Sequence, residues 1–258
     1  MHDICNYDAY FIQKCDATGV LGLLPEQKLT AVIRMLAYRA SADQVDEIAR
    51  MGKSTTSEAL VRFCDAVENL YTRDYLRRPT SRDLQQLLQK AEAQGFPGMI
   101  GSINCMHWQW KNCPTALQGD YGNRKGQKSI ILEAVAGFDT WVWHAFFGVA
   151  GSQNDLNELG QSLVFNDVLR GQGSPIKSTI QSTRYGYKKD VERCFGIIQA
   201  RWLIIRGAAR LFDEEILRSI MMTCIILHNM IVEDEYDYDA LEVYEPDPMN
   251  TALSRNRW

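Results

Sequence analysis

Acidic residues in the second half of the chain could together hold metal ions. Cleavage of a phosphodiester by two Mg²⁺ ions needs hard oxygen ligands, and the two ions lie about 4 Å apart. A fold supplies these ligands by placing one acid on a central strand, another at a neighbouring strand end and a third on a helix packed across the sheet. Candidate acids in this half of the chain include Asp155 and, in a strongly helical segment, Glu192. Asp139 and Asp167 are candidate substitutes.

Residues 1–96, which precede these acids, are predicted to be helical because apolar residues recur there at spacings of three and four. Ala42–Arg50 and Thr55–Val67 are expected to be two short helices joined by a glycine-containing turn, which is the outline of a helix-turn-helix. A plain helical hairpin has the same pattern, and Glu58 and Asp65 would be poor neighbours for DNA phosphates. Both interpretations therefore stand.

Several residues are expected to begin or end helices. Thr55 and Glu58 have capping-box spacing, and Ser81 could cap a helix that ends before Gly95. Later in the chain, Gly207 is expected to close one long helix and Asp213 to cap the next.

Three strands are predicted after Gly98, because short runs rich in β-branched and aromatic residues alternate with polar turns. The second and third runs are Ile130–Val135 and Trp141–Val149, and antiparallel hairpins are the natural arrangement. In the first run, alternation places four side chains on one face: Asn104, Met106, Trp108 and Trp110. This face is expected to form a core or groove wall, with a stacking platform for nucleotides as the alternative.

Helical patterns return after Ala150, weakly over Asp155–Leu169 and strongly over Lys188–Arg206 and Asp213–Glu233. Arg170–Tyr187 lacks periodicity and is predicted to be a long loop. Helices, then strands, then helices predict an α/β or α+β body with a helical N-terminal region.

Three stretches of this chain resemble successive motifs of PIF/Harbinger transposases and their domesticated relatives. They are Gly98–Trp108, Trp143–Asp155 and Lys189–Trp202, and the similarity extends from Tyr7 to about Glu235. The resemblance implies a ribonuclease H-like domain over residues 97–232. In that family an Asp, Asp, Glu triad binds divalent metal, Mg²⁺ or Mn²⁺, and the enzyme cuts and joins DNA in the nucleus.

The resemblance also assigns roles to individual residues. Asn104 stands at the position of the first Asp, and Glu192 matches the Glu, so one carboxylate is a carboxamide and one is retained. No segment between Asp155 and Glu192 matches the family strand that carries the middle Asp. The resemblance therefore implies an internal deletion near residues 170–187. Asp155 matches another family acid near the third strand and is the remaining candidate ligand.

Basic residues surround Glu192 along its helix and could follow a DNA backbone. The candidates for DNA binding are Lys188, Lys189, Arg193 and Arg201, and a solvated helix face is the alternative. His144 and His228 are expected to be hydrogen-bonded core histidines, because no Cys or His lies at ligand spacing from either.

Composition narrows the class of protein. No run of 18 apolar residues occurs, so no membrane partner is expected, and the seven scattered cysteines suit a reducing compartment as small buried side chains. The net charge of −4 includes eight acids between Glu233 and Pro248, where no Lys or Arg occurs. The rest of the chain therefore carries a small positive charge. Residues 233–258 are predicted to be an acidic, disordered tail.

These features predict a transposase-derived nuclear protein, with the cytoplasm as a second location. Losing one or two acids should abolish most metal-dependent catalysis, so a DNA- or chromatin-associated binding module is expected. DNA, a Myb/SANT-type DNA-binding protein and chromatin proteins are the partners that the resemblance implies. The alternatives are an active endonuclease that uses Asp155 and Glu192, and a decayed transposon product without function.

Overall fold

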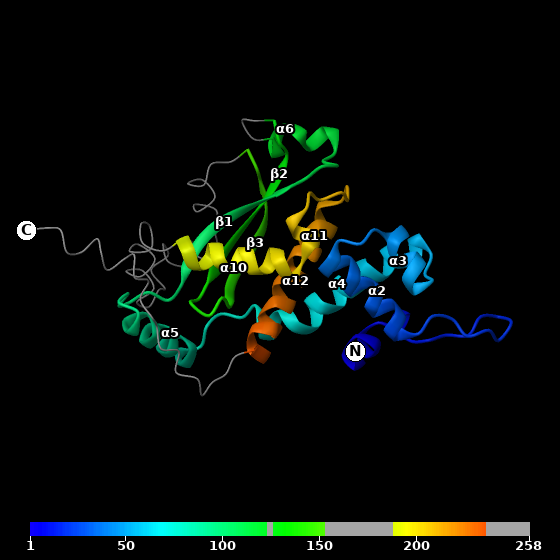
Figure 1. Cartoon of the computed structure of the whole chain (residues 1–258), viewed down its shortest axis with the longest axis horizontal. Helices are drawn as coiled ribbons and strands as arrows, with labels where there is room; N and C mark the ends of the chain where they lie inside the picture. Colours follow the sequence, from blue (N-terminus) through cyan, green and yellow to red (C-terminus); the bar gives the residue numbers. More distant parts are fainter. Residues whose placement is uncertain (123–125, 153–187, 236–258) are drawn as a thin grey trace, which may run out of the picture.

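A computed structural model describes residues 1–122, 126–152 and 188–235 of the chain (Figure 1). The first part is helical and holds α1 (His2–Tyr7), η1 (Ala9–Phe11), α2 (Pro25–Tyr38), α3 (Ala42–Ala49), α4 (Lys53–Tyr75) and α5 (Ser81–Ala93). The strands follow as β1 (Ser102–Gln109), β2 (Ser129–Ala136) and β3 (Val142–Ala150), with the short η2 (Thr115–Leu117) and α6 (Gln118–Tyr121) after β1. The last elements are α10 (Lys188–Arg201), α11 (Leu203–Arg206) and α12 (Glu214–Glu235).

The three strands form an antiparallel sheet in the order β1-β2-β3, as the sequence predicts. The turn between β2 and β3 is closed by the Thr140 N–H, which donates to the Gly137 carbonyl at 3.0 Å. Thr140 has a φ of 66°, in the left-handed region that tight turns require. Together with the helices, the sheet makes an α+β fold.

Helices cover one face of this sheet. α10 packs against β1 and β2, and α12 packs against β3 and α4, so α10 crosses the strands in Figure 1. Met106, Trp108 and Leu132 point into the space between sheet and helices and are buried. This core is continuous with the N-terminal helices, because Leu36 and Phe63 belong to the same cluster of buried side chains. A domain boundary at residue 96 stays a prediction.

α12 is long and apolar enough to cross a membrane by length and composition alone. Ten of its 22 residues are buried, among them Ile220, Cys224 and Ile225. Its apolar character therefore matches its place in the core of the protein.

The N-terminal helices differ from the expected ones at their ends. α4 begins at Lys53 after Gly52 and runs for 23 residues, so Thr55 lies inside the helix and the predicted capping box with Glu58 is wrong. α5 is capped by Thr80 and not Ser81, because the Thr80 hydroxyl accepts from the Asp83 N–H and the Asp83 carboxylate accepts from the Thr80 N–H. α3 and α4 do form a hairpin, but DNA reading by α4 stays a prediction.

The predicted continuous helix from Lys188 to Arg206 is also wrong. It breaks at Trp202, whose φ of −119° and ψ of 86° are not helical, and α11 restarts at Leu203. Trp202 is buried, so burial of its indole ring decides the backbone path at this position. The cap at Asp213 is confirmed, since its carboxylate accepts from the N–H groups of Glu215 and Ile216.

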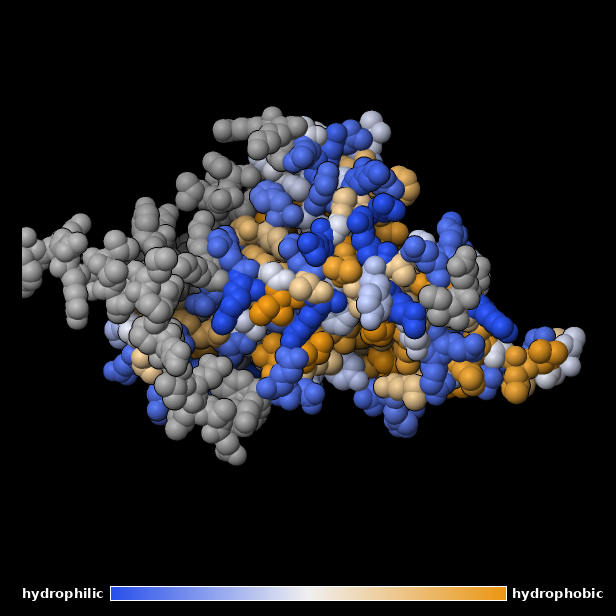
Figure 2. Space-filling view, viewed as in Figure 1, coloured by the Kyte–Doolittle hydropathy of each residue, from blue (hydrophilic) through white to orange (hydrophobic). Residues whose placement is uncertain are grey.

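A hairpin between η1 and α2 projects from the body and is tipped with hydrophobic side chains (Figure 2). Val20 and Leu21 are more than 60% exposed. Asp16 fixes the turn, because its carboxylate accepts from the N–H groups of Thr18 and Val20 at 2.8 and 2.9 Å. The exposed apolar tip thus stands on a locally ordered turn.

Asn229 in α12 joins the two ends of the fold. Its side-chain oxygen accepts from the Val142 N–H at 2.9 Å, and its nitrogen donates to the Val142 and Tyr75 carbonyls at 2.8 and 2.6 Å. Asn229 is fully buried. One side chain therefore satisfies both backbone groups of the first β3 residue and the last carbonyl of α4.

Replacing Asn229 with Leu should lower the free energy of unfolding by more than about 3 kcal/mol, because three buried backbone groups would lose their partners at roughly 1–3 kcal/mol each. Urea denaturation monitored by circular dichroism measures this change. Asn69→Leu, on exposed α4 surface, is the matched control and should shift stability by less than about 0.5 kcal/mol. Equal losses in both variants would contradict the assignment.

Candidate functional site

The structure brings together two of the predicted site residues. Asn104 lies on β1 and Glu192 on α10, and the Asn104 amide nitrogen donates to the Glu192 Oε1 at 3.4 Å. Asn104 is half-buried and Glu192 is exposed. A helix that crosses the sheet thus presents its acid to the first strand, which is the arrangement expected for an ancestral metal site.

α10 holds this position through contacts of its own first turns. The Val191 N–H donates to the buried Ser102 hydroxyl at 3.1 Å, which ties the start of the helix to the start of β1. Val191, Phe195 and Ile198 are buried against the sheet. These residues repeat at three and four and form the buried face of α10, and Glu192 lies at the exposed edge of that face, where it can reach Asn104.

Asp190, two residues before Glu192 on α10, is an acid that the sequence argument did not single out. It is half-buried, and among the described residues its Oδ2 has no hydrogen-bond partner. Burial raises the pKa of the Asp190 carboxyl, and Arg193, 3.9 Å away, lowers it. The sequence gives little reason to single out Asp190, because side chains two positions apart on a helix, such as those of Asp190 and Glu192, do not lie on the same face.

The other candidate acids do not join this pair within the described ranges. Asp139 lies in the turn between β2 and β3, where it accepts from the Trp141 N–H at 3.2 Å and pairs with Lys90 at 3.5 Å. Asp155 and Asp167 lie outside the described residues, as does the predicted deletion near 170–187. In the described part of the chain, no three Cys, His, Asp or Glu side chains gather as a metal site would require.

The basic residues of α10 are partly engaged within the protein. Arg193 donates to the Phe138 carbonyl, and Arg201 donates to His228 Nδ1 at 3.2 Å and pairs with Glu235. Lys188 and Lys189 lie in the first turn of the helix. DNA binding by these four residues stays a prediction.

The aromatic residues of β1 form a wall of the core, as predicted. Trp108 and Trp110 are buried, and their indole N–H groups donate to the carbonyls of Gly207 and Leu211, each at 2.8 Å. Trp108 also packs against Phe147, with ring centroids 6.0 Å apart. Both rings therefore serve packing rather than stacking on nucleotides.

Comparison with known proteins agrees with this arrangement. A family described as plant transposon protein matches residues 73–188 and 185–239, which together cover more than half of the chain. The chain belongs to this family. The match falls into two pieces that meet at residues 185–188, next to the predicted deletion.

A curated protein that is similar to this chain is the protein antagonist of like heterochromatin protein 1 of Arabidopsis thaliana. It is 21% identical over 248 residues, which cover 81% of this chain and 62% of that protein. The chain thus spans about three-fifths of its relative's length. No solved structure matches the chain.

The two predicted core histidines of this family member differ. His228 is fully buried, and its Nε2 donates to the Thr140 carbonyl at 2.9 Å while its Nδ1 accepts from Arg201. His144 is half-buried and lies 3.6 Å from the buried Glu133 carboxylate, and among the described residues neither facing atom has a hydrogen-bond partner, so the prediction is confirmed for His228 alone. Glu133 is a buried acid that the sequence argument did not single out.

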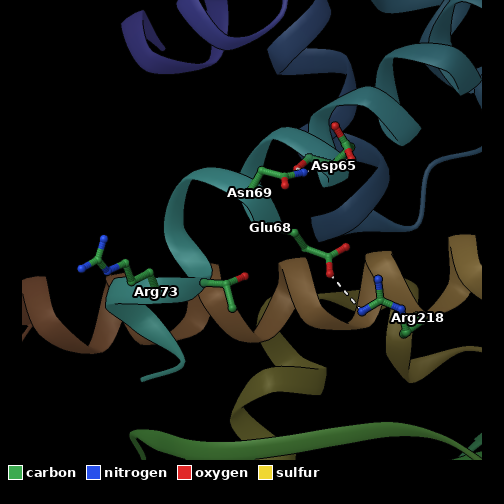
Figure 3. Close-up of a pocket in the computed structure, with 6 residues that line it drawn as sticks. Asp65, Glu68, Asn69, Arg73 and Arg218 are labelled. Carbon is green, nitrogen blue, oxygen red and sulfur yellow. Dashed lines mark hydrogen bonds and ion pairs between the residues drawn. The ribbon is translucent and has the colours of Figure 1, made fainter. Parts of the chain in front are cut away.

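A shallow pocket of about 500 Å³ lies between α4 and α12 (Figure 3). Its lining residues are Asp65, Glu68, Asn69, Thr72, Arg73 and Arg218. Glu68 and Arg218 form an ion pair at 3.0 Å across it, and Ser219 donates to the same carboxylate. These contacts join α4 to α12, and the charges that would bind a ligand already neutralise one another.

His228 should make stability depend on pH. Burial lowers the pKa of His228 to about 4 from its usual 6.5, with Arg201 adding to the effect. The unfolded chain therefore binds the proton first. Stability is full above pH 6.5 and falls towards pH 4, by at most about 1.4 kcal/mol per pH unit.

Urea denaturation of the wild type and of His228→Gln between pH 4 and pH 7.5 measures this effect. Gln keeps a donor for Thr140 and an acceptor for Arg201 but cannot be protonated in this range. The variant should show a flatter dependence than the wild type, because other titrating groups cancel in the difference. Parallel curves would show that His228 does not carry the effect.

Proposed function

We propose that this chain is a transposase-derived nuclear protein that acts as a DNA- and chromatin-associated binding module with a degenerate nuclease site. The observation that carries the proposal is the contact between Asn104 and Glu192 at 3.4 Å. We further propose that β1, β2, β3 and α10 are the remaining part of a ribonuclease H-like core. The antiparallel order of the strands and the acid on the crossing helix support this assignment.

The chemistry of this pair disfavours a bound cation. Two carboxylates in these positions would repel each other until a divalent ion neutralised them. An amide facing a carboxylate attracts it through a hydrogen bond, so Glu192 has a partner without any metal. An Asn in place of an Asp at position 104 thus removes one negative charge that would attract a metal ion. Its amide also competes with a metal ion for the Glu192 carboxylate.

The partners are inferred from the relative and from the family. The printed name of the Arabidopsis protein describes an antagonist of a heterochromatin protein, which supports a chromatin protein as partner and the nucleus as location. Plant transposon ancestry supports DNA and a Myb/SANT-type DNA-binding protein as further partners. A mildly basic body outside the acidic stretch Glu233–Pro248 suits a polyanion.

Titration calorimetry with Mn²⁺ and Mg²⁺ tests the proposed loss of the metal site. The wild type should bind neither ion at millimolar concentration, and Asn104→Asp should bind Mn²⁺ about tenfold more tightly or better. One added unit charge at about 4 Å from a divalent ion contributes roughly 8 kcal/mol at an effective dielectric of 20, which solvent screening reduces strongly. Glu192→Gln in the Asn104→Asp background should remove the gain.

Asn104→Leu is the size-matched control, since it removes the amide without adding a ligand. It should leave metal affinity at the wild-type level and the circular dichroism spectrum unchanged. If wild-type protein binds Mn²⁺, loses binding on Glu192→Gln and cuts duplex DNA, the site is active and the proposal is wrong.

A further inference from the structure

The segment that follows α11 is held by an unusual number of hydrogen bonds. Every backbone carbonyl from Gly207 to Leu211 accepts one, and each donor is different. In chain order the donors are the Trp108 indole at 2.8 Å, the Arg39 guanidinium at 3.1 Å, the Lys111 N–H at 2.9 Å, the Asn112 side chain and the Trp110 indole at 2.8 Å. The Ala209 N–H donates in turn to Gln109 at 2.7 Å. This irregular segment is therefore fixed as firmly as an edge strand.

The fixed backbone presents its side chains to solvent. Arg206 and Arg210 are exposed, Leu211 is 38% exposed and Phe212 is 69% exposed. Only Ala209 of the segment is buried. A large aromatic ring on a rigid backbone loses little conformational freedom when it binds, which is typical of the anchor residues of protein interfaces.

Cationic residues lie on this segment and next to it. Arg39, at the end of α2, donates from its guanidinium to the Ala208 carbonyl, and Lys111, which follows Trp110, donates its backbone N–H to the Ala209 carbonyl. Arg39, Lys111, Arg206 and Arg210 form no ion pair with any other residue in the described ranges. We call these four residues, with Leu211 and Phe212, the arginine–phenylalanine ridge. It lies beside α11 in Figure 1, and hydrophilic side chains gather over α11 in Figure 2.

The chain itself contains a segment of matching chemistry. Residues 236–248 carry five acids and no Lys or Arg, and they include three tyrosines with Leu241 and Val243. Carboxylates suit the free guanidinium groups of the ridge, and the tyrosines suit Phe212. We propose that residues 236–248 of a second copy of this chain bind to the arginine–phenylalanine ridge.

Distance favours binding between copies over binding within one chain. α12 begins at Glu214, two residues after Phe212, and runs for 22 residues to Glu235. At 1.5 Å per residue its two ends lie roughly 30 Å apart. Thirteen extended residues span at most about 43 Å, so within one chain only the last few acids could return to Phe212. A second copy can place the whole acidic segment on the ridge, and reciprocal binding closes a dimer.

Sedimentation equilibrium of the full chain tests this association. At low salt the chain should dimerise, and 0.5 M NaCl should weaken the association about tenfold or more because exposed charges are screened. Arg206→Glu with Arg210→Glu should abolish it, and so should Asp237→Arg with Asp239→Arg. Phe212→Ala keeps every charge and should weaken it about tenfold if the ring is an anchor.

The two charge-reversed chains provide the decisive arm. Each should be monomeric alone, and an equal mixture should form a heterodimer, because the unchanged acidic segment of the ridge variant then meets the unchanged ridge of the segment variant. Circular dichroism melting curves check that every variant is folded. Arg73→Glu with Arg82→Glu, at exposed positions of α4 and α5, is the matched control and should leave dimerisation unchanged.

The proposal is wrong if sedimentation equilibrium shows that the full chain stays monomeric at 100 µM. It is also wrong if the ridge variants leave dimerisation unchanged, or if a mixture of the two charge-reversed chains stays monomeric. If the ridge variants lose affinity for duplex DNA while self-association is unchanged, the ridge is a nucleic-acid surface and the proposal is wrong. None of these outcomes depends on metal binding at Asn104 and Glu192, so the proposed function is tested separately.

Discussion

The hydrogen bonds that Asn229 makes with Val142 and Tyr75 hold the two halves of the fold together. A helix that packs on the edge of a sheet normally leaves backbone groups of the edge strand without partners. Here the Asn229 side chain of α12 replaces a neighbouring strand for Val142, and the preceding residue, His228, satisfies the Thr140 carbonyl in the turn before β3. Because the same asparagine reaches the end of α4, the sheet and the N-terminal helices share one core.

The candidate site depends on that core but contributes little to it. Val191 and Phe195 place α10 by burial, and Ser102 places its first turn by a hydrogen bond. None of these contacts involves Asn104 or Glu192. The arrangement of α10 on β1 can therefore persist when side chains at the candidate site change, because packing maintains it. This separation explains how the Asn104 carboxamide still meets Glu192 across the sheet.

Local patterns in the sequence predicted most of the secondary structure. Short runs of β-branched and aromatic residues between polar turns predicted the three strands, and Asp213 predicted the start of α12, because both signals arise from neighbours in the chain. The break at Trp202 was missed, since burial of that ring is decided by residues distant in sequence. The family motif brought Asn104 and Glu192 together, whereas composition and spacing alone would not have done so.

Long-range polar contacts were the least predictable part. Nothing local indicates that Trp108 and Trp110 donate to carbonyls about 100 residues later, or that Arg39 joins them. The pairing of Glu133 with His144 was equally hidden, because a buried acid on a strand resembles an exposed one in sequence. Such contacts depend on how several elements pack in the folded protein. The spacing of apolar residues in a single sequence predicts helices and strands but not their long-range contacts.

The self-sufficient docking of α10 has a consequence for the length of the chain. β3 ends at Ala150 and α10 begins at Lys188, and each is held by contacts within the described body. Because each element is anchored separately, the docking of α10 on β1 sets no requirement on the number of residues between them. Insertions or deletions between Ala150 and Lys188 should therefore leave the described core in place.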